Sequence, residues 1–215
     1  MQKRTVGFML FSILLSLVSC IKHEVIPPPI NTVDLDCNFL GTINGTNTEY
    51  TQNVQGYNCY NDDNLYYTNP SPNLSNCLYT AEIRSFQQNQ KVKIIFGPLK
   101  WDGGVSSYPT LNMFNDFHSS NSDQQIPLMN VEDMTGTNAG VQIEYTDSNG
   151  DKWETSTDDQ PGVVIFTLLN QDSDNTGDYS LFECSFSITV YRVDPNQGLL
   201  SLNLNNCKFR GWFKR

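Results

Sequence analysis

The chain has 215 residues, with 23 acidic residues against 13 lysines and arginines, so its formal net charge is −10 at pH 7. This acidic balance argues against partners such as nucleic acid or anionic lipid head groups. Histidine occurs only at His23 and His118, which excludes most zinc and iron centres and most histidine-based catalysis. The abundance of Tyr, Phe, Thr, Ser and Asn predicts an all-β protein of short strands joined by polar turns.

The first twenty residues have the features of a secretory signal. A basic pair precedes an apolar run over residues 6–18 that is too short, and too near the start, for a stable membrane span. The end of this run, Leu17-Val18-Ser19-Cys20, resembles a bacterial lipobox. The resemblance implies that residues 1–19 are removed and that Cys20 becomes the lipid-modified N-terminus, since several acyl chains, palmitate among them, anchor a protein where one would not. The alternative is an ordinary signal peptide with a chance cysteine.

The mature chain would then begin with a tether. Residues 20–35 include Pro27-Pro28-Pro29, which favours an extended polyproline II conformation that holds the body away from the bilayer. Residues 36–215 are predicted to form a single domain. Without residues 1–19 the chain keeps 11 basic and 23 acidic residues, a net charge of −12.

The first part of the body predicts a hairpin and a long loop. Residues 37–43 have strand character, Asn44-Gly45 is a strong hairpin turn, and residues 48–55 form the return strand. Residues 56–76 form a loop with Cys59 and Cys77 at its ends, and a disulfide between them would close it. The alternative is two buried thiols. Once Cys20 carries lipid, five cysteines remain, so at least one is free or pairs between chains.

The middle of the chain predicts another hairpin and one helix. The strands are residues 78–86 and 92–96. Pro109 would begin the helix, and apolar residues recur at three-residue spacing over residues 111–117. We expect this helix to plug one end of a β core.

Residues 140–213 show the clearest strand pattern. Residues 141–146 and 152–155 flank an Asp-Ser-Asn-Gly turn. Residues 163–169 form a continuous apolar run, which predicts a central strand covered on both faces. Residues 181–193 alternate and turn at residues 194–198 into a last strand. The pattern as a whole predicts an antiparallel β-sandwich of about ten strands with one short helix.

The last strand changes parity along its length. Its apolar residues fall on even numbers through Leu204 and on odd numbers from Cys207. A β-bulge at Asn205-Asn206 would reconcile the two halves. With that bulge, Cys184 and Cys207 share a face but lie diagonally, too far apart for easy bridging.

Several of these segments resemble a broad group of small lipoproteins of the Bacteroidetes. The resemblance rests on the strand-and-turn patterns of residues 41–45, 140–145 and 149–153, the long strand that contains Phe186, and residues 206–209, where Cys207 replaces a glycine common in that group. It covers most of the mature chain and implies a β-sandwich on the outer membrane, on its periplasmic or cell-surface side, without a particular activity.

One acidic segment has the spacing of a calcium-binding loop. Its oxygen-bearing residues, with a glycine at position 6 and a glutamate at position 12, match an EF-hand; the ligands would be Asp172, Asp174, Thr176, Asp178 and Glu183. The flanking segments are strands and not helices, so the alternative is a solvated hairpin loop.

A second set of candidates is basic or aromatic. Trp212 is predicted on the polar side of the last strand with Lys208 and Arg210, and Trp101 and Tyr108 lie in a glycine-rich segment. Exposed rings can stack on sugars or anchor a protein partner, although such rings often pack against a neighbouring strand instead.

The sequence contains no Gly-x-Ser-x-Gly motif and no phosphate-binding loop. We therefore expect a non-catalytic, lipid-anchored envelope protein, with a two-carboxylate glycoside hydrolase as the less favoured alternative. The expected role is an accessory subunit of an outer-membrane β-barrel assembly, or else a glycan-binding lipoprotein that recognises polysaccharide. No cofactor is expected beyond the calcium considered above.

Overall fold

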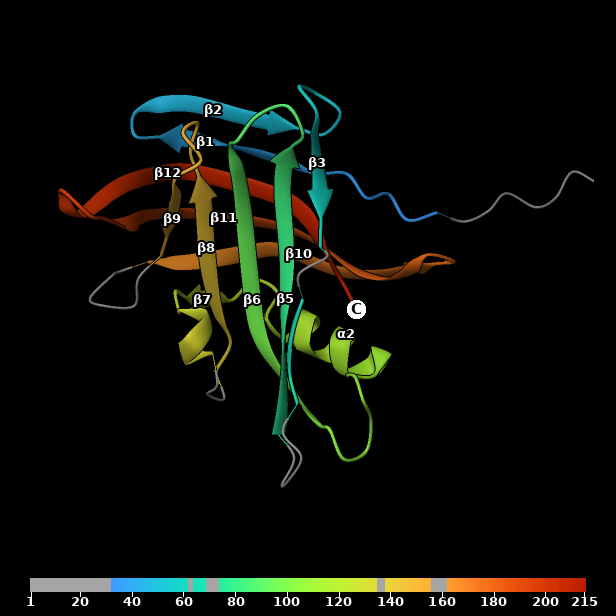
Figure 1. Cartoon of the computed structure of the whole chain (residues 1–215). Helices are drawn as coiled ribbons and strands as arrows, with labels where there is room; N and C mark the ends of the chain where they lie inside the picture. Colours follow the sequence, from blue (N-terminus) through green and yellow to red (C-terminus); the bar gives the residue numbers. More distant parts are fainter. Residues whose placement is uncertain (1–31, 62–63, 69–73, 135–137, 156–161) are drawn as a thin grey trace, which may run out of the picture. The chain divides into compact units, whose positions relative to one another are not determined.

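A computed structural model describes residues 32–61, 64–68, 74–134, 138–155 and 162–215 (Figure 1). The predicted signal peptide, the lipidation site Cys20 and the tether up to residue 31 lie outside these ranges. Residues 32–35 lie against the body: Val33 is buried, and its backbone N–H donates to Asp174 Oδ2 at 2.9 Å. No helix within the described ranges is both long and apolar enough to cross a membrane.

The described residues form twelve strands, one α-helix and one short 3-10 helix. The strands are β1 (Asn38–Ile43), β2 (Thr46–Thr51), β3 (Tyr57–Tyr60), β4 (Leu65–Tyr67), β5 (Leu74–Ser85), β6 (Lys91–Asp102), β7 (Gln125–Pro127), β8 (Gly140–Thr146), β9 (Lys152–Glu154), β10 (Val163–Asp174), β11 (Gly177–Asp194) and β12 (Gly198–Lys214). The helices are α2 (Leu111–Ser120) and η1 (Val131–Asp133). The predicted all-β class with one short helix is confirmed.

All twelve strands belong to one sheet that folds over itself into two layers. The first layer contains β2, β1, β12, β11, β10 and β7; the second contains β9, β8, β6 and β5, with β3 and β4 beside β5. Figure 1 shows the strands of one layer running across those of the other, as in sandwiches with orthogonal packing. The 18-residue β11 joins the layers, because it pairs with β10 and β12 and, through Tyr191, with Glu154 of β9. Where the ends of the sheet approach each other, Tyr50 of β2 stacks on Tyr57 of β3.

The predicted hairpins are present. Asn44 and Gly45 both have positive φ, 47° and 84°, which is the backbone of the turn that the Asn-Gly pair favours. The predicted hairpins β5–β6, β8–β9 and β11–β12 form with antiparallel pairing. Helix α2 begins after Thr110, whose hydroxyl accepts the Met113 N–H at 3.3 Å. It packs against β6 and β10 and buries Phe114 and His118.

The bulge predicted in the last strand is also present. Phe186 of β11 lies opposite Cys207, but Ile188 lies opposite Leu204, so the two residues Asn205 and Asn206 face Ser187 alone. Asn206 has φ 50°, and its N–H donates to Ser187 Oγ at 2.9 Å. Because of the bulge, both Leu204 and Cys207 are buried although they are three residues apart. The bulge therefore determines which side chains of β12 face outward.

Gly41 of β1 accommodates this bulge. A Cβ atom at this position would lie 2.5 Å from Cys207 Sγ, closer than packed atoms allow. Cys184 and Cys207 are buried free thiols, and their opposite partners are Phe209 and Phe186. The two cysteines thus share a face and lie diagonally, as the bulge predicted.

Strand β10 corrects one sequence expectation. It was predicted to be covered on both faces, but only Val164, Phe166 and Leu169 are buried, while Thr167 is exposed and Leu168 is 40% exposed. No described element covers the outer face of the first layer here. The apolar side chains of residues 163–169 therefore lie on both faces of β10. Those on the inner face belong to the core, and those on the outer face form an aliphatic surface.

Candidate functional site

The outer face of the first layer carries side chains in register across five strands. In β12 after the bulge, Cys207 and Phe209 point into the core, whereas Lys208 and Arg210 are exposed. In β11, Ser185 and Ser187 alternate with buried Phe186 in the same way. Because residues that lie opposite one another on adjacent strands share a face, these side chains assemble into rows that run across the strands.

Two such rows lie side by side. The first row passes from β10 to β2 through directly opposed residues, which are Ile165, Ser185, Lys208, Leu40 and Glu49. The second row contains Leu168, Glu183, Arg210, Asn38 and Thr51. Neighbouring strands are about 4.8 Å apart, so each row spans about 19 Å. The rows mix hydrogen-bonding groups, charges and short aliphatic surfaces.

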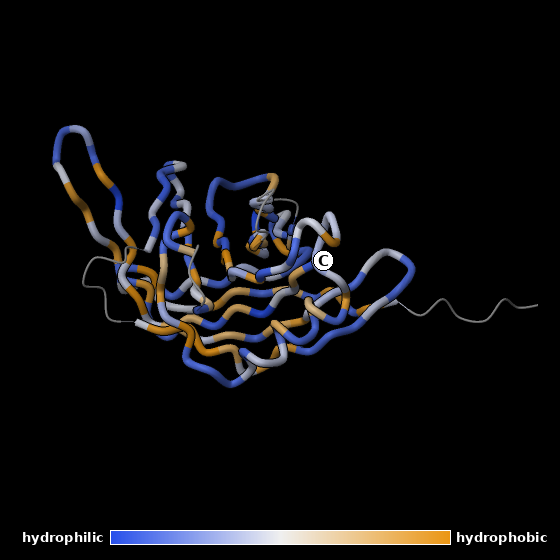
Figure 2. The backbone as a smooth tube through the Cα atoms, turned by 90° about the horizontal axis from the view of Figure 1, so that it is seen from below, coloured by the Kyte–Doolittle hydropathy of each residue, from blue (hydrophilic) through white to orange (hydrophobic). Residues whose placement is uncertain are grey.

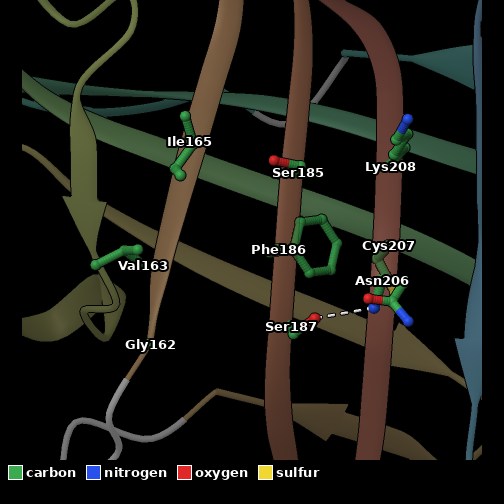
Figure 3. Close-up of a pocket in the computed structure, with 9 residues that line it drawn as sticks. All are labelled: Gly162, Val163, Ile165, Ser185, Phe186, Ser187, Asn206, Cys207 and Lys208. Atoms are coloured by element: carbon green, nitrogen blue, oxygen red, sulfur yellow. Dashed lines mark hydrogen bonds between the residues drawn. The ribbon is translucent and has the colours of Figure 1, made fainter.

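The same face is hollowed by three adjoining depressions. The first has a volume of about 480 Å³ and lies over β10, β11 and β12 (Figure 3). The second, of about 360 Å³, shares Ser185 and Lys208 with the first. The third, of about 400 Å³, shares Asn206 with the first and Leu40 with the second. Because their linings overlap, the three form one shallow depression across β10, β11, β12, β1 and β2, which we call the outer groove.

The first depression has Lys208 at one side, on β12, and Ile165 at the other, on β10 (Figure 3). Its other polar side chains are Ser185, Ser187 and Asn206, and the exposed edges of Val163 and Ile165 form an aliphatic wall. Within the described residues, the Lys208 ammonium has no carboxylate at ion-pair distance, and the side chains of Ser185 and Asn206 make no hydrogen bond. These groups are therefore available to a ligand without breaking an interaction inside the protein.

The second depression carries a loosely held ion pair. Arg210 Nε lies 3.8 Å from Glu183 Oε1, and both side chains are about half exposed, at 48% and 53%. Such an exposed pair contributes about 0–1 kcal/mol, so either partner can be drawn to a ligand at small cost. Leu40 and Leu168, 39% and 40% exposed, place aliphatic surface on each side of these charges.

The aromatic candidates do not converge on the outer groove. Trp212 lies two residues beyond Arg210 on the same face, but it is half-buried and its ring meets Tyr179 edge to face, with 5.5 Å between centroids. Trp101 was predicted at an exposed site and is instead 2% exposed, with its indole N–H donating to the Ser106 carbonyl at 2.9 Å. The reason is that β6 continues to Asp102 and pairs Trp101 with Ser75, which places its ring in the core.

Tyr108 belongs to a separate depression of about 270 Å³ near the end of β12, lined by Tyr66, Tyr108, Pro109 and Arg215. The rings of Tyr66 and Tyr108 meet edge to face at 5.3 Å. Arg215 is engaged within the protein: its guanidinium donates to Asp178 Oδ2 at 2.8 Å and to the Pro109 carbonyl at 3.3 Å. This depression therefore offers ring edges but no free charge.

The predicted calcium ligands do not converge. Asp174 and Gly177 close the β10–β11 hairpin, whereas Glu183 lies opposite Leu168, further along β11. Glu183 lies six residues beyond Gly177 along β11, a rise of about 20 Å, so the glutamate cannot close a loop around an ion. Asp174 Oδ1 instead accepts hydrogen bonds from the backbone and hydroxyl of Thr176, and these bonds, together with the Val33 N–H, lower its pKa to about 2.

The other predicted ligands are also used inside the hairpin. Asp172 lies opposite Tyr179, and Asp178 accepts from Ser173 and Arg215. Among the described residues, no group of three or more His, Cys, Asp or Glu side chains could hold a metal ion. The EF-hand-like spacing is thus the sequence of a solvated β-hairpin.

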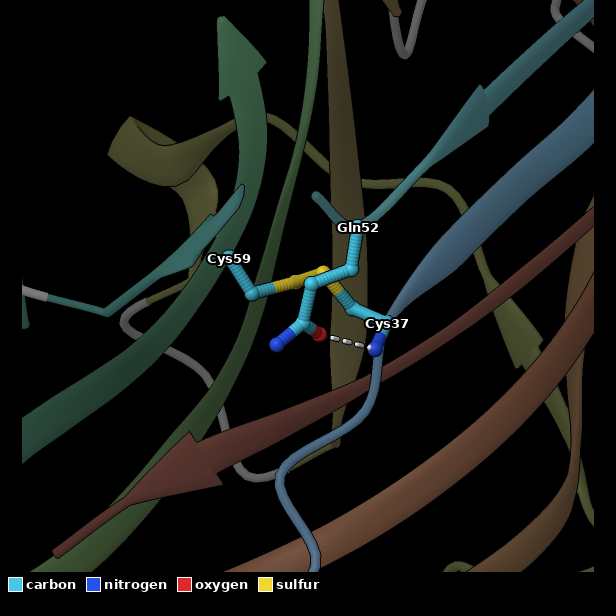
Figure 4. Close-up of a disulfide and its surroundings, with 3 residues drawn as sticks. All are labelled: Cys37, Gln52 and Cys59. Atoms are coloured by element: carbon cyan, nitrogen blue, oxygen red, sulfur yellow. Dashed lines mark hydrogen bonds between the residues drawn. A yellow bond between two sulfur atoms is a disulfide. The ribbon is translucent and has the colours of Figure 1, made fainter. Parts of the chain in front are cut away.

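The predicted disulfide is wrong in one partner. Cys59 bonds to Cys37, with 6.0 Å between their Cα atoms (Figure 4). Cys77 is a buried free thiol whose pKa burial raises to about 12. Cys59 lies opposite Ile83 on β5, six residues beyond Cys77, so about 20 Å of strand separates Cys77 from the position that faces Cys59. The backbone N–H of Cys37 donates to Gln52 Oε1 at 2.7 Å (Figure 4), which fixes the start of β1 beside the bridge.

The body's histidine is part of the core. His118 is 2% exposed and lies among aromatic rings, with Phe114 at 4.3 Å and Phe213 at 5.5 Å between centroids. Burial lowers the pKa of His118 to about 3, although its Nδ1 lies 2.8 Å from the Phe114 carbonyl oxygen. The imidazole is therefore neutral at physiological pH and removed from solvent, a structural role and not that of a proton shuttle.

Sequence reasoning placed Lys208 and Arg210 on a shared outer face but did not identify the residues that complete the groove. Among these are Asn38, Leu40, Ile165, Ser185 and Asn206. The alternation of apolar and polar residues along each strand is a signal in the sequence that marks these residues as outward-facing. The order of the strands in the sheet, which brings the residues together, could not be predicted from the sequence. Comparison with protein-family models, curated proteins and solved structures finds no match.

Proposed function

We propose that this chain is a lipid-anchored, non-catalytic glycan-binding protein of the bacterial outer membrane, and that the glycan lies in the outer groove. The observation that carries the proposal is the row of Ile165, Ser185, Lys208 and Leu40 across four strands, with hydrogen-bonding groups that have no partner in the described part of the chain. A sugar chain presents both hydroxyl groups and apolar C–H faces, and the row offers a counterpart for each.

The composition of the groove favours a glycan over a protein partner. Buried centres of protein–protein interfaces are enriched in Tyr, Trp, Phe, Met and Arg and depleted in Ser and Lys. The outer groove has Ser185, Ser187, Asn206 and Lys208 over its first depression. Short serine and asparagine side chains, together with an ammonium group, bind polar ligands through several modest hydrogen bonds. The groove is also open at the surface, so an extended polymer can enter it from the side.

The proposed location follows from the N-terminal sequence. The lipobox-like Leu17-Val18-Ser19-Cys20 supports a lipid anchor, and the proline-containing tether would hold the outer groove away from the bilayer. The resemblance to small lipoproteins of the Bacteroidetes supports the outer membrane as its site. A binding protein held in this way would concentrate a polysaccharide at the envelope.

The test is affinity electrophoresis of the folded protein through gels that contain neutral or anionic polysaccharides. Ser185→Tyr fills the centre of the first depression, and we expect it to abolish the retardation seen for the wild type. Ser201→Tyr is the matched control, because Ser201 is an exposed residue of β12 that does not line any of the three depressions. Free migration of the wild type through every gel, or equal retardation of the two variants, would contradict the proposal.

A second candidate function is that of an accessory subunit of an outer-membrane assembly. The observation that favours it is the β11–β12 hairpin, which projects from the body (Figure 2). This hairpin carries the opposed pair Val193 and Leu199, which are 77% and 68% exposed. An exposed apolar pair on a projecting element is suited to insertion into a partner protein. Purification of the lipidated protein from native membranes should recover that partner, and Val193→Ser with Leu199→Ser should lose it.

A further inference from the structure

The outer groove contains an uncompensated positive charge in an acidic protein. The whole chain has ten more acidic than basic side chains, yet the first depression is lined by a single charged side chain, the ammonium of Lys208. No ion-pair partner of Lys208 occurs in the described residues. A cation in a concave surface focuses its field toward a ligand more effectively than one on a convex surface.

A second cation lies close to the first. Arg210 is two residues along the same face of β12, about 7 Å away by strand geometry. Its only ion-pair partner among the described residues is Glu183, whose Oε1 lies 3.8 Å from the Arg210 Nε. A carboxylate or sulfate over β12 would lie within reach of both basic side chains, and the guanidinium could turn to it without leaving a buried charge behind.

The acidic side chains of the groove lie away from the place over β12 where Lys208 and Arg210 would bind an acidic group. Glu183 occupies the second row beside Arg210, and Glu49 ends the first row on β2, two strands from Lys208 and so about 10 Å away. The first row therefore favours negative charge over β12 and β11 and disfavours it over β2. Such a pattern selects a charged unit at Lys208 and an uncharged unit over Leu40, next to Glu49.

From these positions we infer that the ligand is an anionic glycan, with the acidic group of one sugar unit bound at Lys208 and Arg210. The hydroxyls of the same unit would bind Ser185 and the side chain of Asn206, and its apolar face would contact Ile165. The uncharged unit that follows would lie over Leu40. The inference rests on the proposed function and adds to it the charge and the orientation of the glycan.

The bulge of β12 makes this arrangement possible. Without the extra residue at Asn205-Asn206, the parity of β12 would place Lys208 and Arg210 toward the core. The bulge turns both cations outward and presents Asn206 beside them, with φ 50°. A β-bulge that re-aims side chains at a binding surface is a recurrent device in β proteins.

The test is isothermal titration of the full folded chain with three soluble polysaccharides of similar length: polygalacturonate, dextran sulfate and neutral dextran. We expect the anionic chains to bind more tightly than dextran and to lose affinity as ionic strength rises. Lys208→Gln should weaken binding of the anionic chains by about fivefold, the loss of one exposed charge pair. Lys152→Gln is the matched control, because it removes the same charge from β9 in the second layer, where the side chain is also exposed.

The outcomes separate the two proposals. Equal binding of dextran and polygalacturonate, unchanged in Lys208→Gln, would overturn the anionic preference while the glycan-binding function stands. Equal losses in Lys208→Gln and Lys152→Gln would show binding by overall charge and would also overturn the inference. If none of the three polysaccharides binds, the proposed function itself fails. Polygalacturonate and dextran sulfate distinguish a carboxylate from a sulfate as the recognised group.

Discussion

The Cys37–Cys59 disulfide provides a quantitative test of the fold. It closes a loop with a sequence separation of 22 residues that contains β1, β2 and the start of β3. By the chain-entropy relation, cross-linking a loop of this length stabilises the folded state by about 3.4 kcal/mol. Natural domains have about 5–15 kcal/mol of stability in total, so the bond contributes a substantial share.

The perturbation is the double substitution Cys37→Ala with Cys59→Ala. We expect the free energy of unfolding in urea to fall by about 3.4 kcal/mol, and the melting temperature by about 7–14 °C for a domain of this size. A non-thiol reductant should destabilise the wild type by a similar amount and leave the double variant unchanged. Because both cysteines are packed against the core, some of the loss will also reflect their removed side chains.

The control is Cys77→Ala, which removes the free thiol that the sequence suggested as the partner of Cys59. This variant should keep the full destabilisation by reductant, although it is itself less stable because a buried group is removed. If Cys77→Ala abolishes the effect of reductant, or if peptide mapping without reduction finds Cys59 linked to Cys77, the pairing of β3 with β5 is wrong. A loss below about 1 kcal/mol in the double variant would refute the entropy argument.

Four further predictions concern other parts of the chain. Gly41→Ala should destabilise the protein by about 1–3 kcal/mol in urea unfolding, because its Cβ would clash with Cys207, and adding Cys207→Ala should recover part of the loss. His118 stays neutral in the folded state to about pH 3, whereas the unfolded chain takes up its proton near pH 6.5; stability should therefore fall by about 2 kcal/mol between pH 7 and pH 5, and the fall should be smaller in His118→Phe. The melting temperature should be the same with millimolar calcium as with a chelator, since the acidic hairpin gathers no metal site; a rise with calcium that Asp174→Ala removes would count against this. Cys20→Ala should yield an unprocessed or soluble protein, and a membrane-bound species of mature length would disprove the lipid anchor.

Turn chemistry and strand parity made much of the fold predictable. Asn44-Gly45 specifies its hairpin because both residues tolerate positive φ. The change of parity between Leu204 and Cys207 located a bulge that the structure confirms, and this also placed Lys208 and Arg210 on one outward face. These features depend on neighbours in sequence, which a single sequence displays directly.

The predictions that were wrong concern features that depend on the pairing of segments far apart in the sequence. Cys59 was assigned to Cys77 because both flank one loop, but the register of β3 on β5 separates them and β1 brings Cys37 to Cys59 instead. Trp101 was expected at the surface because it lies in a glycine-rich segment beyond the strand predicted over residues 92–96, whereas β6 continues through Pro98 to Asp102, opposite a register shift in β5. A proline next to a bulge can remain in a sheet because the ladder is already interrupted there.

The outer groove could not be predicted for the same reason, because it also depends on the pairing of distant segments. Ser185, Lys208 and Leu40 come from three strands whose adjacency arises only from the order β1-β12-β11. Each residue could be assigned to an outward face from its own strand, but nothing local shows that the three lie opposite one another. The apolar residues of β10 were read as core for the same reason, although Leu168 faces solvent.

The most direct test of the account is to map the backbone amide signals of the isotope-labelled protein by NMR while it is titrated with a short oligogalacturonate. We predict that shifts concentrate along the row of Ser185, Lys208 and Leu40 and extend to Asn206 at the bulge, and that they disappear in Ser185→Tyr. Shifts that gather instead around Tyr66 and Tyr108, or that spread over the surface without saturating, would contradict the assignment of the outer groove as the binding site.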